Sequence, residues 1–264
     1  MPTKQVQVLR LKQGQKSYQE VDLLAQEVAI ALVYNGISHV VLMATPQAVE
    51  ELAMGLSLTE GIVQSLEQIY DIETQESELG ITVQMQIASA CFATLKERRR
   101  QMSGRTGCGL CGIDSLEAVQ PKVQPITHQN KIKRQDIEQA LAVFERSQPL
   151  REQTGSLHGA AWVEQGTIKA LYEDVGRHNA LDKLLAHLVR HKVKRQEGFV
   201  LVSSRASFEM VAKAAVVGIT CIVAVSAATE LAVSLAEQAN ITLIGFARAE
   251  RQTVYTHPEF LVED

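Results

Sequence analysis

The fold class is decided by residues 199–246, FVLVSSRASFEMVAKAAVVGITCIVAVSAATELAVSLAEQANITLIGF. Three short apolar runs in this stretch predict strands at Phe199–Ser203, Cys221–Val225 and Ile241–Phe246. The two intervening segments repeat apolar residues at helical spacing, which predicts a helix between each pair of strands. Alternating strands and helices favour parallel strands joined by right-handed crossovers. The second half of the chain is therefore predicted to be an α/β unit.

The carboxyl ends of these predicted strands carry hydroxyl groups and arginines. The three ends are Ser203–Ser207, Ser226–Thr229 and Phe246–Arg248. Parallel α/β sheets bind ligands outside such strand ends, and Ser207 and Thr229 suit the N-cap positions of the helices that follow. Helix N-termini, hydroxyls and arginines together favour a phosphate or pyrophosphate ligand. The alternative is that the hydroxyls are ordinary helix caps and the arginines ordinary surface residues.

The segment Glu173–Asn179 is expected at the same edge. It leaves a predicted strand and enters a helix, with Asp174 as the expected cap. Arg177 and His178 then fall in the first helical turn, where the helix dipole disfavours positive side chains. This local conflict points to a functional role for both residues. His158 is a weaker candidate, because a lone histidine is more often a hydrogen-bonding residue than a catalytic one.

The first half of the chain is predicted to be rich in strands. Asn35-Gly36 tolerates positive φ and predicts a tight hairpin between Val28–Val33 and Ile37–Met43. Thr45-Pro46 is predicted to be the N-cap and first residue of a helix that ends at Gly61. The other elements expected here are an edge strand at Val6–Leu11, strands at Ile69–Thr74 and Ile81–Ile87, and a helix at Ser89–Met102.

A proline-containing segment, Gln120–Lys133, has few large apolar residues and is the best candidate for a linker. We therefore expect an N-terminal α+β portion over 1–120 and an α/β domain over 121–264. Beyond the linker, the pattern predicts an amphipathic helix over Ile137–Phe144, a hairpin of Ala160–Glu164 and Thr167–Tyr172, and a helix with Leu181, Leu184, Leu185 and Leu188 on one face.

Two cysteines, Cys108 and Cys111, lie in the glycine-rich stretch Ser103–Gly112, which ends the predicted N-terminal portion. Glycine costs about 1 kcal/mol relative to alanine in a helix interior, so four glycines here predict an exposed loop. The preceding Lys96–Arg100 run would favour a thiolate or an incoming anion. The simpler reading of that run is a solvated helix end whose cations interact with the helix dipole.

Four chemistries or roles fit a Cys-x-x-Cys pair. Zinc needs four ligands, and no second pair exists to supply them. Thiol–disulfide exchange usually places the pair at a helix start after a strand, a context that is absent here. The pair could also be purely structural. Sulfur transfer through a persulfide needs an exposed thiolate of lowered pKa with room around it, which arginines and glycines favour.

Composition limits the classes of protein to consider. The chain has 264 residues, 46% of them hydrophobic, a net charge of -4 and a pI near 6.0. This balance gives no reason to expect nucleic acid or an anionic membrane as partner. The polar start carries no signal core, no apolar stretch is long enough to span a membrane, and four cysteines are too few for a disulfide framework. We therefore expect a cytoplasmic protein.

Several motifs, in this order, resemble those of the FdhD family of formate dehydrogenase accessory sulfurtransferases. The resembling stretches are Asn35-Gly36, Thr45-Pro46, Thr59–Gly61, Gly107–Gly112, Thr154-Gly155 with His158, Glu173–Lys183, Ser203–Ser207 with Glu209-Met210, and Tyr255–Pro258. The resemblance implies a larger cytidine deaminase-like part, a three-layer α/β sandwich, preceded by a smaller β-rich portion. It also implies a homodimer.

The resemblance further implies an enzymatic activity. FdhD-like proteins accept persulfide sulfur from a cysteine desulfurase and pass it to the molybdenum or tungsten bis(molybdopterin guanine dinucleotide) cofactor of formate dehydrogenase. In this chain Cys108 would be the persulfide carrier and Cys111 the assisting thiol. Phe246–Arg251 would bind the guanine nucleotide, in agreement with the phosphate site predicted at the strand ends. The expected cofactor-binding residues are Phe246, Ala247, Arg248, Ala249, Glu250, Arg251, Ser203, Ser204, Arg205, Arg177 and His178.

Two qualifications accompany the resemblance. Ser226–Thr229 lacks the proline expected before Thr229, which could loosen that loop and weakens Thr229 as a ligand. The zinc-binding motifs of the deaminases are absent, so we expect no tightly bound metal. A rival hypothesis from another class is a cofactor-binding chaperone for formate dehydrogenase without sulfur chemistry, in which the cysteines would contact only the partner.

Overall fold

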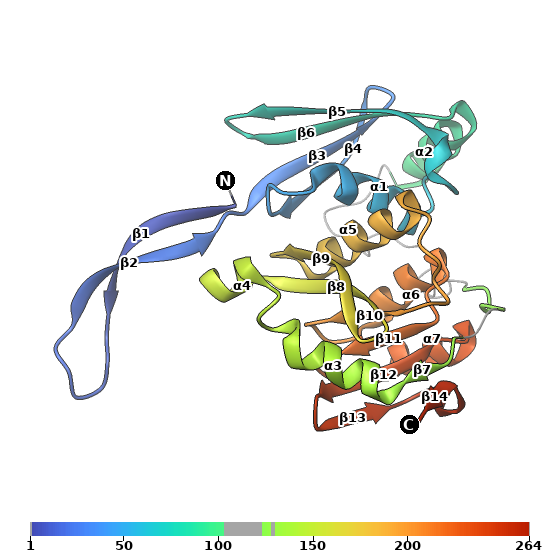
Figure 1. Ribbon diagram of the computed structural model, residues 1–264. Coiled ribbons are helices and arrows are strands. Elements are labelled where there is room, and N and C mark those ends of the chain that lie inside the picture. Colours follow the sequence, from blue (N-terminus) through green and yellow to red (C-terminus); the bar gives the residue numbers. More distant parts are fainter. Residues whose placement is uncertain (1, 103–122, 128–129, 264) are drawn as a thin grey trace.

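The computed structural model describes residues 2–102, 123–127 and 130–263. Figure 1 shows a large sheet with helices on both faces, a smaller four-stranded sheet beside it, and a two-stranded ribbon that projects from the body. No described helix combines the length and the apolar composition needed to cross a bilayer.

The large sheet has six strands in the order β13-β12-β11-β10-β8-β9. Its strands are β8 (His158–Glu164), β9 (Thr167–Asp174), β10 (Phe199–Val202), β11 (Cys221–Ala224), β12 (Thr242–Arg248) and β13 (Arg251–Val254). β10, β11 and β12 are parallel neighbours, which confirms the prediction from the strand–helix alternation. β8 runs antiparallel to β10, so the start of β8 lies beside the carboxyl end of β10.

Helices cover both faces of this sheet. Residues of α5 (Arg177–Arg190), α6 (Phe208–Val217) and α7 (Glu230–Ala239) share one core with Val200 and Val202. α3 (Arg134–Phe144) forms a second core with Phe199 and Leu201 from the same strand. Alternate residues of β10 thus point to opposite helical layers. The predicted α/β sandwich is confirmed.

The smaller sheet has the order β4-β3-β6-β5. Its strands are β3 (Val28–Tyr34), β4 (Ile37–Ala44), β5 (Ile69–Ser77) and β6 (Gly80–Ile87), and α1 (Val49–Thr59) and α2 (Ser89–Met102) pack on one face. Asn35 and Gly36 have φ of 46° and 80°. These values fit the tight turn predicted for the β3–β4 hairpin.

The prediction that Thr45-Pro46 starts a helix was wrong. α1 begins at Val49, after Ala48, which is in the left-handed region with φ 49°. The cause is that two donors of Thr45 are used elsewhere: its backbone N–H and its hydroxyl donate to Asp174 Oδ2 at 3.1 and 2.8 Å. The chain is therefore fixed to the large domain before the helix can start.

α1 and α5 join the two parts of the fold. A Cβ atom added to Gly55 of α1 would lie 2.0 Å from the carbonyl oxygen of Asp182 in α5, so only glycine permits this approach of the helices. Thr59 donates to Asp182 Oδ1 at 2.8 Å one helical turn further along α1. Figure 1 shows α1 between the small sheet and α5.

The remaining elements lie at the periphery. They are the antiparallel ribbon of β1 (Thr3–Arg10) and β2 (Tyr18–Ala25), the parallel pair β7 (Ile132–Lys133) and β14 (Leu261–Val262), α4 (Pro149–Thr154), and 3-10 turns at Leu66–Gln68 and Pro258–Phe260. The predicted edge strand at Val6–Leu11 is thus one strand of the ribbon. The division of the chain at residue 120 stays a prediction.

Candidate functional site

The carboxyl ends of β10, β11 and β12 and the loops that follow them are hydrogen-bonded into one surface, here called the rim. Ala206 and Ala228 form a parallel bridge, and Ala206 N–H donates to Ala227 O at 3.0 Å. Phe246 N–H donates to Ser226 O at 2.9 Å. The convergence of three strand ends on one edge, predicted from the sequence, is therefore present in the structure.

The segment Phe246–Arg251 forms the outer part of the rim. Phe246 is 43% exposed and has a φ of 48°, unusual for an aromatic residue. Ala247 is fully buried in the core under α3, so its methyl group faces away from any rim ligand. The Arg248 guanidinium donates to the carbonyls of Val225 and Ala247. Ala249, Glu250 and Arg251 are exposed, with Arg251 starting β13.

The inner part of the rim contains Ser203, Ser204 and Arg205. Ser203 Oγ accepts a hydrogen bond from Gly159 N–H at 2.9 Å, which ties the loop after β10 to the start of β8. Ser204 is buried and its hydroxyl donates to the Arg205 carbonyl, whereas Arg205 is exposed. Only Arg205 of these three presents its side chain freely to solvent.

Three buried polar atoms near the rim have no hydrogen-bond partner among the described residues. They are His158 Nδ1, Arg177 Nε and Ser207 Oγ. Such atoms cost about 1–3 kcal/mol each when left unpaired. Ser207 occupies the N-cap position of α6 without making the cap bond, whereas Thr229 does cap α7, accepting from Ala232 N–H at 3.3 Å. The unpaired set fits a ligand rich in acceptor oxygens.

The pKa values of the two histidines at this edge are both lowered. Burial lowers the pKa of His158, and Arg151, Arg177 and His178 lower it further. Burial is also the largest cause of the lowered pKa of His178, whose Nε2 lies 2.8 Å from Glu209 Oε2. His178 lies at the start of α5, and Glu209 lies at the start of α6. A neutral imidazole can donate to a phosphate oxygen without adding charge.

Asp174 holds the loop that carries Arg177 and His178, but not as the predicted cap. Gly176 is the N-cap residue, and Asp174 Oδ1 accepts from Gly176 N–H and from Asn179 Nδ2, each at 2.9 Å. Asp174 Oδ2 accepts from Lys183 Nζ at 2.5 Å. Asp174 and Lys183 are both 0% exposed, so this ion pair fixes the start of α5.

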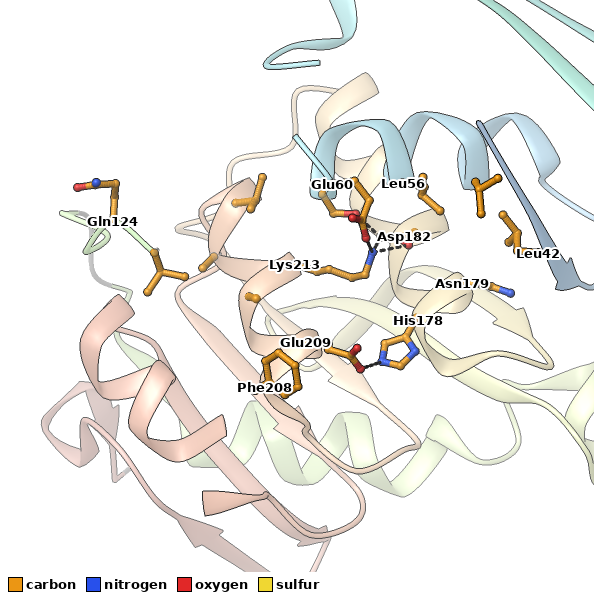
Figure 2. Close-up of a pocket in the computed structure, with 16 residues that line it drawn as sticks. Leu42, Leu56, Glu60, Gln124, His178, Asn179, Asp182, Phe208, Glu209 and Lys213 are labelled. Atoms are coloured by element: carbon orange, nitrogen blue, oxygen red, sulfur yellow. Dashed lines mark hydrogen bonds and ion pairs between the residues drawn. The ribbon is translucent and has the colours of Figure 1, made fainter. Parts of the chain in front are cut away.

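A cavity of about 820 Å³ lies between α1, α5, α6 and β4. Figure 2 shows the Lys213 ammonium pointing to Asp182 and Glu60 beneath α1, and the His178–Glu209 pair on another wall. Its lining residues are Val40, Leu42, Leu56, Thr59, Glu60, Val123, Gln124, His178, Asn179, Asp182, Phe208, Glu209, Ala212, Lys213, Ala215 and Val216.

Lys213 is paired with two carboxylates of the cavity, those of Asp182 and Glu60. Lys213 donates to Thr59 Oγ1 and to both Asp182 oxygens within 2.9–3.1 Å. Burial lowers the pKa of Lys213, but Asp182 and Glu60 outweigh that effect and the net pKa is raised. Sequence reasoning did not identify Asp182, Lys213 or the pairing of Glu209. The signal for the first was an acidic residue in the helix that carries Leu181, Leu184, Leu185 and Leu188 on one face.

The model of the FdhD/NarQ family matches residues 25–262. The chain belongs to this family. It is 48% identical over 236 residues to the sulfur carrier protein FdhD of Acinetobacter baylyi, covering 89% of this chain and 86% of that protein. It is 50% identical over 241 residues to the FdhD protein of Cupriavidus necator, covering 91% and 84%.

A solved structure shares the fold. It is a candidate formate dehydrogenase accessory protein from Desulfotalea psychrophila, with a TM-score of 0.78 and 21% identity over 99% of this chain and 100% of that one. The recognition of the family and of the α/β fold is therefore confirmed. Cys108 and Cys111 lie outside the described residues, so their predicted roles remain predictions, as does the nucleotide-binding role of the rim.

Proposed function

We propose that this chain is a sulfurtransferase that matures the cofactor of formate dehydrogenase. Cys108 takes a sulfur atom from the persulfide of a cysteine desulfurase, and the sulfur passes to a molybdenum or tungsten bis(molybdopterin guanine dinucleotide) substrate at the rim. The names of the relatives support sulfur carriage at a coarse level. The observation that carries the acceptor side is the set of unpaired polar atoms at His158, Arg177 and Ser207.

The first step is a thiolate exchange at sulfur. The Cys108 thiolate attacks the outer sulfur of the donor persulfide, a new S–S bond forms to Cys108, and the donor cysteine leaves as its thiolate. This step needs a Cys108 thiolate, and the arginines of the preceding sequence would lower its pKa. In the transfer step the Cys111 thiolate attacks the inner sulfur of the Cys108 persulfide, so that a Cys108–Cys111 disulfide forms and the outer sulfur leaves at the sulfide level for the substrate.

The acceptor side follows from the chemistry of the rim. Arg177 Nε, the neutral His158 ring and the Ser207 hydroxyl supply donors for nucleotide phosphate oxygens. Phe246, exposed beside these loops, offers a flat apolar surface for a guanine ring. The residues of this chain thus hold the substrate through its nucleotide, which leaves the metal end free for sulfur.

The cavity supports a connection between the two sites. Val123 and Gln124 line one part of it, and they follow the cysteine stretch closely in the sequence. His178 lines the same cavity and belongs to the helix start at the rim. A volume of about 820 Å³ far exceeds what one sulfur atom needs. We also propose, as the family resemblance implies, a cytoplasmic homodimer.

The decisive experiment incubates the protein with a cysteine desulfurase and cysteine, and then measures the mass of the peptide that contains Cys108. A gain of one sulfur atom in the wild type, lost in Cys108→Ala but kept in Cys221→Ala, is expected. Cys221 is a suitable control because it is buried and burial raises the pKa of its thiol. No gain of sulfur would favour the cofactor-binding chaperone instead.

A second measurement tests the rim. Binding of GDP is expected to weaken by about tenfold or more in Arg177→Gln, since a charge-assisted hydrogen bond contributes about 1.5–3 kcal/mol. Arg146→Gln is a matched control, because Arg146 is exposed just after α3 and bonds only locally to Ala142 O among the described residues. Unchanged GDP affinity in Arg177→Gln would remove the phosphate site from the rim.

A further inference from the structure

Positive and negative side chains are separated along the first part of the chain. Residues 1–16 contain Lys4, Arg10, Lys12 and Lys16 and no acidic residue, whereas residues 17–95 contain eleven Asp and Glu residues and no Lys or Arg. The β1–β2 ribbon, residues 3–25, is here called the arm. Within the small sheet the acidic residues lie on β5, as Asp71, Glu73 and Glu76, whereas the tip of the arm, with Lys12 and Lys16, is basic.

The arm has little support within its own chain. Figure 1 shows it projecting away from the body, with its tip far from both sheets, and β2 contacts α4 near its base. A two-stranded ribbon alone is at best marginally stable in water. Leu9 and Leu11 are 59% and 80% exposed. These features indicate that the arm packs against another surface.

The two faces of the arm differ in charge. Cross-strand pairs such as Leu9–Gln19 and Gln7–Val21 lie on one face, which carries no charged residue along its length. Arg10 lies on the other face, where it pairs with Glu20 and Asp22 at 2.5 and 3.0 Å. The uncharged face suits a surface that is itself largely uncharged.

Such a surface exists on the small sheet. The core of this sheet lies on the side of α1, as buried Ile30 and Leu32 show. Val41 and Met43 of β4 point to the opposite face and are 60% and 49% exposed. β4 is an edge strand without Asp, Glu, Lys, Arg or Pro, the residues that usually protect an edge. An exposed apolar surface of this kind is typical of an interaction site.

The same face becomes acidic toward β5. Asp71 and Glu73 pair with Gln86 and Gln84, whose side chains alternate with buried Met85. Both carboxylates are exposed. The outer face of the small sheet is thus apolar at β4 and acidic at β5.

We propose that the arm of one copy lies across the outer face of the small sheet of a second copy. The uncharged face of the arm would cover Val41 and Met43, with Lys12 and Lys16 beside Asp71 and Glu73. The dimensions agree: the eight residues of β1 extend about 26 Å, and four strands span roughly 14 Å. Twofold symmetry makes this contact twice. The arm and the small sheet of one sequence are complementary in charge, yet they lie apart within the described residues of one copy (Figure 1), which favours a second copy as the occupant.

The test is a charge exchange followed by sedimentation equilibrium of the full chain. Lys12→Glu with Lys16→Glu, and separately Asp71→Lys with Glu73→Lys, are each expected to weaken the dimer about 10- to 100-fold, because exposed ion pairs are lost and repulsions gained twice over. Combining all four substitutions is expected to restore most of the affinity. The wild-type dimer should also weaken as salt is raised.

The control is Lys169→Glu, an exposed lysine of β9 outside both surfaces, which should leave the dimer unchanged. A monomeric wild type would overturn the inference. A dimer whose affinity is unchanged by either double substitution would also overturn it. The same holds if the variant with all four substitutions dimerises more weakly than both double variants. Those last two results would leave dimerisation itself, and the sulfurtransferase proposal, standing.

Discussion

Asn in place of Asp174 tests how the start of α5 is held. In the wild type, Asp174 Oδ2 accepts from Lys183 Nζ at 2.5 Å, and both side chains are 0% exposed. Burial lowers the pKa of Lys183, and Asp174 opposes that effect. In Asp174→Asn the ammonium group stays buried without its counter-charge, which costs about 3–5 kcal/mol. Total stability is about 5–15 kcal/mol, so the loss would be large.

Lys183 can avoid the buried charge by releasing its proton, which makes the stability of the variant depend on pH. Releasing its proton at pH 7 costs about 1.4 kcal/mol for each unit below its ordinary pKa of about 10.4, or about 4.6 kcal/mol in total. A native state with neutral Lys183 binds fewer protons than the unfolded chain. The stability of the variant therefore rises with pH between 7 and 10, and its deficit relative to the wild type shrinks.

Urea denaturation of the wild type, Asp174→Asn, and Asp174→Asn with Lys183→Met at pH 7 and 9 measures these terms. The double variant should recover part of the loss, because removing both charges avoids the buried unpaired ammonium. A deficit below about 1 kcal/mol for Asp174→Asn, equal at both pH values, would refute the account of the pair.

Three further predictions follow from the packing and charge of single residues. Gly55→Ala should destabilise by about 1–3 kcal/mol or more in urea denaturation, since its methyl group would overlap the Asp182 carbonyl; equal stability would refute the close approach. His158→Asn should reduce the loss of stability below pH 6.5, because the lowered pKa of His158 makes the native state bind fewer protons there; an unchanged pH profile would contradict this. Thr229→Ala should cost about 1 kcal/mol through loss of the cap on Ala232 N–H, whereas Thr229→Ser should cost less.

The fold followed from the sequence wherever local chemistry decides it. Asn35-Gly36 fixed a hairpin, and the apolar runs around Cys221 fixed parallel strands, because turns and periodicity depend on neighbours in the chain. The helix start predicted at Thr45 was wrong for the opposite reason. Its partner Asp174 lies 129 residues away, and no local pattern shows such a pairing.

The candidate site was predictable in part. The strand-end loops were expected to converge and do so, whereas the side chain of Ala247 is buried and turned away from a rim ligand. Asp182 and Lys213 form a pair that only tertiary structure reveals, since they lie on different helices. The charge of each residue was visible in the sequence, but the identity of its partner was not.

The tight crossing of α1 and α5 restricts the motions open to the protein. Opening the two sheets about this crossing would separate Thr45 from Asp174 and Thr59 from Asp182, and would uncover two ion pairs at once. A hinge that swings one half against the other is therefore expensive. These contacts disfavour domain closure of the kind used by many two-part enzymes, and they set the distance between the rim and the small sheet in the resting molecule.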